Sequence, residues 1–182
     1  MRRPLILHPA FQCPPVTAIT VDILRPTPTT LNLAFTLAGD VAGLRVPPPA
    51  EAARADNLWK HTCFEAFLRP VGGEAYVEFN LSPSTRWAAY RFDSHRQGMA
   101  DATAIAAPVI AFRTTAGGLE LTAALDLAGA PDLAGTFQLG VTAVIETSDG
   151  ALSYWALAHP PGGPDFHHPD GLAIELPPTG PL

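Results

Sequence analysis

Tyr76, Glu78 and Asn80, whose side chains can form hydrogen bonds, occupy alternate positions in the run Tyr76-Val-Glu78-Phe-Asn80. Alternate side chains of an extended strand share one face, so the phenol, the carboxyl and the amide lie together. Glu65 joins them if residues 62–68 pair with this run. Hydrogen-bonding groups beside flat rings suit a small polar ligand, because hydroxyl groups bond to carboxyls and amides while rings stack on apolar faces. The aromatic candidates nearby are Trp59, Trp87 and Tyr90.

The two glutamates also have other interpretations. They could form ion pairs with Arg69, Arg91 or Arg96 and simply brace the sheet. A pair of carboxylates about 5 Å or 6.5–9.5 Å apart is also the apparatus of glycoside hydrolysis. The sequence carries no further signature of that reaction and shows no phosphate-binding or nucleophile-elbow motif. We therefore predict a protein that is not an enzyme.

Histidines and aspartates gather near the C-terminus at His159, Asp165, His167, His168 and Asp170. Imidazole and carboxylate ligate metals, but His-His-Pro-Asp matches no standard ligand spacing, and no metal site is predicted. A methionine and a histidine are a known axial pair for haem iron, so Met99 with one of these histidines is a possible haem site. The chain has no Cys-x-x-Cys-His attachment motif.

Short runs of alternating apolar and polar residues extend along the chain, for example at 19–23, 31–37, 62–68, 75–81 and 87–92. This period-two pattern predicts β-strands, and turns such as Gly72-Gly73 and Ser148-Asp149-Gly150 predict hairpins. We expect an all-β fold, a two-sheet antiparallel β-sandwich of the jelly-roll type with about ten strands. Twenty prolines leave room for a helix at most near 50–57 or 94–103.

The composition limits the classes of function that the protein can have. A chain of 182 residues suits one domain, 1–182, with a core from about 16 to 176 and proline-rich termini. The net charge of -6 and the single lysine, Lys60, argue against nucleic-acid binding. The two cysteines, Cys13 and Cys63, are expected as buried free thiols. The apolar run Pro4–Leu7 is too short for a secretory signal, so we expect a cytoplasmic protein without membrane contact.

Four segments taken together resemble a known family. They are Trp59…Cys63-Phe-Glu-Ala-Phe-Leu68, Tyr76-Val-Glu-Phe-Asn-Leu-Ser-Pro83, Trp87-Ala-Ala-Tyr-Arg-Phe92 and Pro164-Asp-Phe-His167…Leu176. Their order resembles the DOMON-like domains related to family 9 carbohydrate-binding modules. The resemblance implies a sandwich that binds sugars or haem without catalysis. It also implies that sugar lies between tryptophans, for which Trp59, Trp87 and Trp155 are the candidates.

The sequence thus predicts a non-catalytic β-sandwich that binds a small polar ligand, most simply a carbohydrate, and needs no cofactor. The alternatives are a haem-binding domain of the electron-transfer type and a protein-interaction module. The predicted ligand-binding residues are Trp59, Glu65, Tyr76, Glu78, Asn80, Trp87, Tyr90, Arg96 and Trp155.

Overall fold

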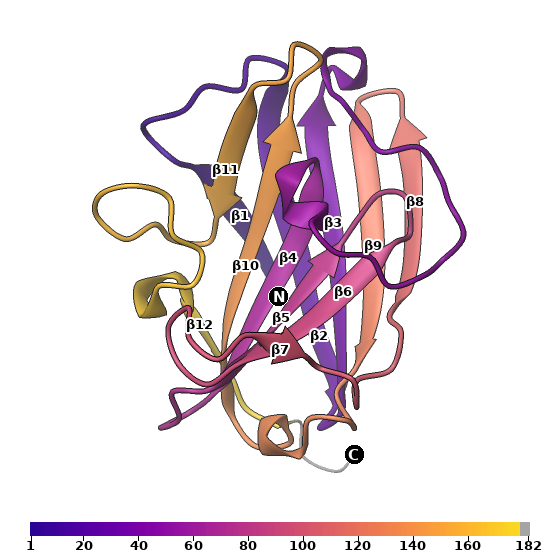
Figure 1. Ribbon diagram of the computed structural model, residues 1–182. Helices are drawn as coiled ribbons and strands as arrows, with labels where there is room; N and C mark the ends of the chain where they lie inside the picture. Colours follow the sequence, from indigo (N-terminus) through magenta and orange to yellow (C-terminus); the bar gives the residue numbers. More distant parts are fainter. Residues whose placement is uncertain (179–182) are drawn as a thin grey trace.

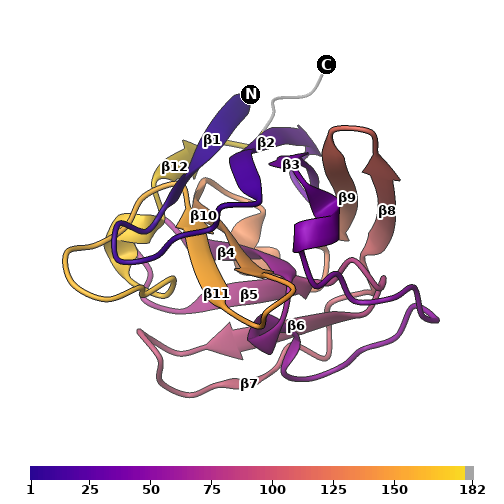
Figure 2. The same cartoon turned by 90° about the horizontal axis from the view of Figure 1, so that it is seen from above.

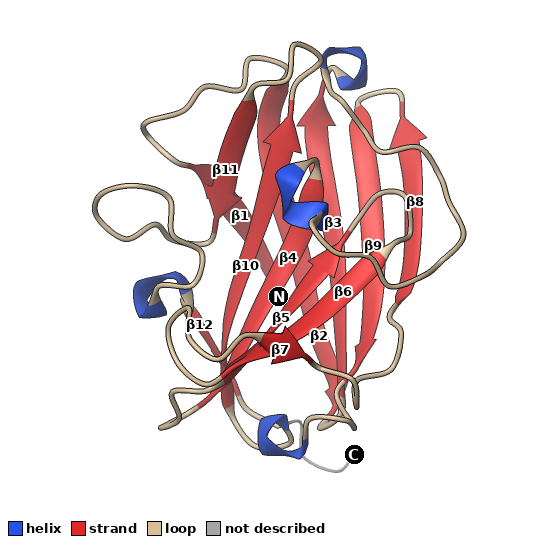
Figure 3. Ribbon diagram, in the orientation of Figure 1, coloured by secondary structure: helices blue, strands red, loops and turns tan. Residues whose placement is uncertain are grey.

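The computed structural model describes residues 1–178, and within that range it contains strands, loops and four short 3-10 helices but no α-helix (Figure 3). The twelve strands are β1 (Arg2–Leu7), β2 (Val16–Thr27), β3 (Thr30–Gly39), β4 (Cys63–Pro70), β5 (Tyr76–Leu81), β6 (Trp87–Phe92), β7 (Ala100–Asp101), β8 (Val109–Thr115), β9 (Gly118–Asp126), β10 (Phe137–Glu146), β11 (Leu152–Ala156) and β12 (Ile174–Leu176) (Figure 1). The 3-10 helices are η1 (Val41–Gly43), η2 (Leu58–Lys60), η3 (Pro131–Leu133) and η4 (Pro169–Gly171). The predicted all-β class is confirmed.

The strands join into one continuous antiparallel path in the order β7-β6-β5-β4-β10-β11-β1-β2-β3-β9-β8, and β12 pairs with β10. The link is β1, because residues 2–5 pair with β2 while Ile6 and Leu7 pair with β11. Seen from above, the strands on the two sides of β1 form two arms that face each other (Figure 2). The structure therefore has one curled sheet where we expected two separate sheets.

Apolar side chains from both arms fill the space between them. Phe35 of β3 meets Phe64 of β4 with ring centroids 4.7 Å apart, and both rings are almost fully buried. Along β5, Val77, Phe79 and Leu81 pack in this core, as the alternation predicted. Burial of large apolar side chains is the main term that stabilises such a sheet. The intervening β5 residues consequently face outward, away from the core.

Several local predictions have clear outcomes. The segments around Gly72 and Asp149 connect neighbouring antiparallel strands, as predicted, and the segments around Pro83 and Gly117 do the same. Residues 50–57 are not helical, because their backbone instead bonds to Ser84 and to Trp87 of β6. Residues 94–103 contain the short strand β7 and no helix.

The sheet begins earlier in the chain than the predicted core boundary at residue 16. β1 runs over Arg2–Leu7, but only its Leu5 side chain is fully buried. The segment Arg2-Arg3-Pro4 therefore shows no apolar alternation, which is why the pattern did not reveal this strand. Cys13 and Cys63 are buried free thiols, as predicted. Among residues 1–178 there is no apolar helix of membrane-spanning length.

Candidate functional site

A hollow of about 350 Å³ opens on the outer face of the arm that contains β11, β10, β4, β5 and β6. Two loops complete its wall, the β6–β7 loop (residues 93–99) and the β11–β12 loop (residues 157–173). The lining residues are Trp59, Glu65, Phe67, Glu78, Phe92, Arg96, Met99, Val144, Tyr154, Pro164, Phe166 and His167. Clefts that bind small ligands have volumes of roughly 300–1,000 Å³ and mostly apolar walls with a few convergent polar groups.

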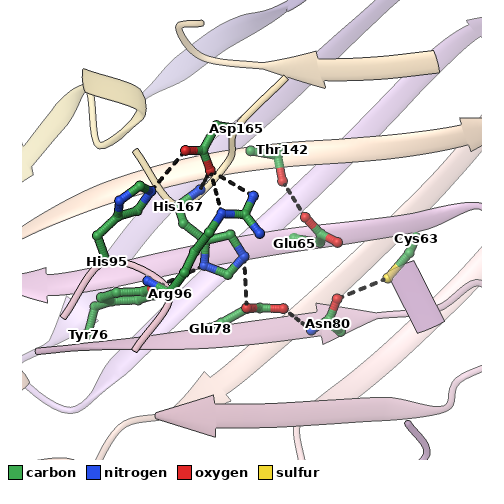
Figure 4. Close-up of polar contacts among 10 residues, drawn as sticks. All are labelled: Cys63, Glu65, Tyr76, Glu78, Asn80, His95, Arg96, Thr142, Asp165 and His167. Carbon is green, nitrogen blue, oxygen red and sulfur yellow. Dashed lines mark hydrogen bonds and ion pairs between the residues drawn. The ribbon is translucent and has the colours of Figure 1, made fainter. Parts of the chain in front are cut away.

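The two glutamates lie at the sheet surface beneath this hollow. The register pairs Glu65 of β4 with Asn80 and pairs Phe67 with Glu78 of β5, so the glutamates are diagonal neighbours. Their exposed fractions are 2% for Glu65 and 5% for Glu78. Thr142 donates to Oε2 of Glu65 at 2.9 Å, and the amide of Asn80 donates to Oε1 of Glu78 at 2.5 Å (Figure 4).

Neither glutamate is paired with an arginine. Arg69 donates to the side chain of Gln138, and Arg96 donates to Asp165. Among the described residues, Arg91 forms no ion pair. The interpretation in which the arginines brace the sheet through Glu65 and Glu78 is therefore wrong.

Burial sets the protonation of this pair. Removal from water raises the pKa of Glu65 to about 8, with a further rise from the neighbouring charge of Glu78 and a small opposing effect of the Thr142 hydroxyl. Burial likewise raises the pKa of Glu78 to about 7, against the opposing effects of Asn80 and Arg96. The two groups titrate as one unit. Near neutral pH the pair therefore retains a proton.

His167 closes one side of the hollow. The backbone N–H of Arg96 donates to the hydroxyl oxygen of Tyr76 at 3.2 Å, and the oxygen lies 2.7 Å from Nδ1 of His167. The Tyr76 hydroxyl is therefore hydrogen-bonded to both Arg96 and Nδ1 of His167, and the imidazole tautomer sets the direction of the second bond. Nε2 faces Oε2 of Glu78 at 3.8 Å. Burial lowers the pKa of His167 to about 4, so the ring is neutral at pH 7.

An ion-paired cluster lies at the rim. Asp165 of the β11–β12 loop accepts from the Nε and Nη2 of Arg96 at 3.1 and 2.8 Å, and its other oxygen lies 2.8 Å from Nε2 of His95. Arg96 has a left-handed backbone with φ of 56°, uncommon for a residue other than glycine. That conformation aims its N–H at Tyr76 and its guanidinium at the opposite loop, so the two loops are joined across the site.

The predicted site residues divide into three groups. Trp59, Glu65, Glu78 and Arg96 line the hollow. Tyr76, Asn80 and Tyr90 lie on the same outer face beneath or beside it, where Asn80 bonds Glu78 and the Tyr90 ring packs edge-on against Trp59 with centroids 6.0 Å apart. Trp87 and Trp155, the third group, do not line the hollow.

The prediction for those two tryptophans is wrong. Trp87 packs against the core between the arms, and Trp155 is 6% exposed within that core, where its Nε1 donates to Ser153. Strand alternation gives the reason: Trp87 and Tyr90 are an odd number of positions apart and therefore point to opposite faces. The ring that β11 presents to the hollow is Tyr154, the residue next to Trp155.

Other lining residues were not identified as binding residues from the sequence. Phe67 and Phe92 are each an even number of positions from a predicted site residue on the same strand, so alternation could have found them. Phe166 and His167 lie on the β11–β12 loop, for which no periodic signal exists. The indications in that segment were the gathering of histidines around residue 167 and its place among the four segments that resemble DOMON-like domains.

Two of the residues that the sequence suggests for a haem site lie at the hollow. Met99 is at the wall and half exposed, and His167 lines the same space. Nδ1 of His167 lies 2.7 Å from the Tyr76 hydroxyl, and Nε2 lies 3.8 Å from Oε2 of Glu78. His168 does not line the hollow. Within residues 1–178 there is no group of three or more His, Cys, Asp or Glu side chains placed to hold a metal ion.

The structure is that of an all-β protein with a hollow of a size suited to a small ligand on the outer face of its sheet. Among solved structures, the chain is similar to a protein of Bacteroides uniformis described as a "putative carbohydrate-binding protein". The TM-score is 0.66 at 13% sequence identity, and the match covers 94% of this chain and 83% of that one. At this identity the likeness shows a shared fold. No protein-family model matches the sequence, and no curated protein matches it.

Proposed function

We propose that the protein is a non-catalytic binding domain for a small polar ligand, a saccharide, in the hollow above Glu65 and Glu78. One observation carries the proposal: two carboxyl groups are almost fully buried at the base of an accessible hollow and have no cationic side chain paired with them. Buried polar groups are normally satisfied by partners. Each carboxyl has one hydrogen bond, and Oε1 of Glu65, which has no partner among the described residues, is the oxygen that a bound ligand contacts.

The walls support a saccharide. Trp59, Phe92, Tyr154 and Phe166 place aromatic surface around the carboxyls, and sugars offer hydroxyls to polar groups and apolar ring faces to aromatic ones. The similar Bacteroides uniformis fold and the resemblance of the sequence to DOMON-like domains agree with this assignment. Both similarities concern fold and pattern, so the ligand assignment depends mainly on the hollow.

A glycan array with the purified chain tests the proposal. We expect at least one glycan to bind, with about tenfold weaker binding in Trp59→Ala, which loses a wall ring, and in Glu78→Gln. Glu120→Gln, which changes an exposed residue of β9, is the matched control and keeps full affinity. No glycan bound, or equal binding in all four proteins, contradicts the proposal. Cleavage of the bound glycan, seen by mass spectrometry, contradicts its non-catalytic part.

A further inference from the structure

We infer that the ligand carries a protonated amine, and that this ammonium group binds at the free carboxyl oxygen of Glu65, surrounded by the aromatic wall. The inference rests on the proposed function, since it concerns the same hollow and narrows the saccharide to an amino sugar. It follows from three observations: the charges around the hollow, the free oxygen, and the nature of the wall.

The charges around the hollow do not balance. Its acidic groups are Glu65, Glu78 and, at the rim, Asp165, whereas Arg96 is the only Lys or Arg among its lining residues. Both hydrogen bonds of the Arg96 side chain go to one oxygen of Asp165, so its charge is already matched. His167 is neutral, as argued above. The glutamate pair retains a proton near neutral pH and has no cation paired with it. An ammonium group at Glu65 displaces that proton and supplies the counter-charge that a buried carboxylate normally has.

Glu65 is the better anchor of the two. Its side chain is buried, and its only hydrogen bond joins Oε2 to Thr142. Oε1 has no hydrogen-bond partner among the described residues, yet the side chain lines the hollow. Glu78 has Asn80 on one oxygen and Nε2 of His167 facing the other. Arg96 acts on Glu78 electrostatically and would repel a second cation there, so an ammonium group is favoured at Glu65.

The wall of the hollow also suits a cation. Trp59, Phe67, Phe92, Tyr154 and Phe166 contribute aromatic rings, and Met99 contributes a polarizable sulfur. An ammonium group within about 6 Å of a ring face is attracted by the ring quadrupole, and more strongly so where water is excluded. A neutral hydroxyl would meet the same oxygen but carries no charge with which to displace the proton of the pair. The structure therefore favours the amine over its uncharged analogue.

Calorimetric titration at pH 7 separates these ligands. The probes are glucosamine and its β-1,4-linked dimer, each compared with its N-acetylated counterpart, which keeps the ring but removes the charge. We expect at least tenfold tighter binding of the free amines. Glu65→Gln abolishes that preference, because glutamine keeps the shape and the Thr142 contact without the charge. Glu74→Gln, which removes an exposed charge outside the hollow, keeps the preference.

A second measurement needs no sugar and no variant. Ethylammonium chloride should raise the melting temperature above that in sodium chloride of equal ionic strength, since a ligand selective for the native state stabilises it. Equal affinity for amines and acetylated forms, with no ethylammonium effect, overturns the amine while saccharide binding stands. Ethylammonium stabilisation without binding of any sugar overturns the saccharide and leaves the amine site. Absence of every signal overturns both.

Discussion

Glu65 and Glu78 make the stability of the folded chain depend on pH near neutrality. Their raised pKa values mean that the folded chain holds a proton that the unfolded chain, with ordinary glutamates, has already lost. Unfolding then releases a proton, so rising pH favours the unfolded state. His167 and His159 act oppositely because burial lowers their pKa values, and their effect falls away as the pH rises above 6.5, the ordinary value of the unfolded chain. Between pH 6.5 and 8 the glutamate pair is therefore the dominant titrating unit.

We predict that the free energy of unfolding falls between pH 6.5 and 8. The slope is about 1.4 kcal/mol per pH unit for each proton released. Urea denaturation at four pH values measures it. The double variant Glu65→Gln and Glu78→Gln should be nearly flat over this range, whereas Glu120→Gln should keep the original slope. A flat profile in the unmodified protein would show that the pair titrates normally.

At the scale of single elements, the β11–β12 loop depends on a glycine beneath it. Gly140 of β10 lies opposite Phe67 on the outer face. A Cβ there would come within 3.0 Å of the carbonyl oxygen of Gly171 and of the Leu172 side chain, so the absence of a side chain lets the loop pack on the sheet. The loop also holds His167, and its docking therefore positions one wall of the hollow.

We predict that Gly140→Val displaces the β11–β12 loop and weakens ligand binding by at least tenfold. The rest of the sheet stays folded, because valine suits a strand. Hydrogen exchange should show faster exchange confined to residues 157–173. Gly135→Val is the control, since a Cβ at Gly135 meets no atom within 4 Å. Unchanged hydrogen exchange in residues 157–173 would mean that Gly171 and Leu172 can shift to accommodate the valine without destabilising the loop.

Arg25 connects several segments of the chain through hydrogen bonds to their carbonyl groups. It is 4% exposed, and its two terminal nitrogens donate to the carbonyl oxygens of Gly135, Leu176, Pro28, Leu133 and Ala134 at 2.7–3.1 Å. The guanidinium carbon lies 4.3 Å from the centre of the Phe137 ring. These contacts tie β2 to the η3 segment and to β12. They balance the buried charge with carbonyl dipoles and a ring face.

We predict that Arg25→Met destabilises the protein by about 3 kcal/mol, because several carbonyls lose charged donors at once. Lysine should rescue it only partly, since an ammonium group lacks the planar fork. Arg113→Met, which removes an exposed pair with Glu120, should change stability by less than about 1 kcal/mol. Denaturant midpoints measure all three. Equal effects at both positions would contradict the role assigned to Arg25.

For the whole molecule, the sequence predicts well which face of a strand each side chain is on. It predicts poorly which distant segments of the chain pack together. The outward direction of Tyr76, Glu78 and Asn80 followed from period two alone, and the structure agrees. The same rule applied to Trp87 and Tyr90 would have separated them. The docking of residues 157–173 and the double pairing of β1 depend on contacts between residues more than a hundred positions apart. No local pattern carries that information.

The role of β1 in joining the two arms of the sheet can be tested directly. Deletion of residues 1–7 exposes the edges of β2 and β11, and exposed edges pair with other chains. We predict that the deletion variant forms oligomers and melts earlier, and that a synthetic peptide of residues 1–9 restores the monomer by adding a strand. Arg3→Ser, an exposed change within β1, should stay monomeric. Size-exclusion chromatography and thermal melting decide the matter. A monomeric deletion variant with an unchanged melting temperature would mean that the two arms hold together through their shared core alone.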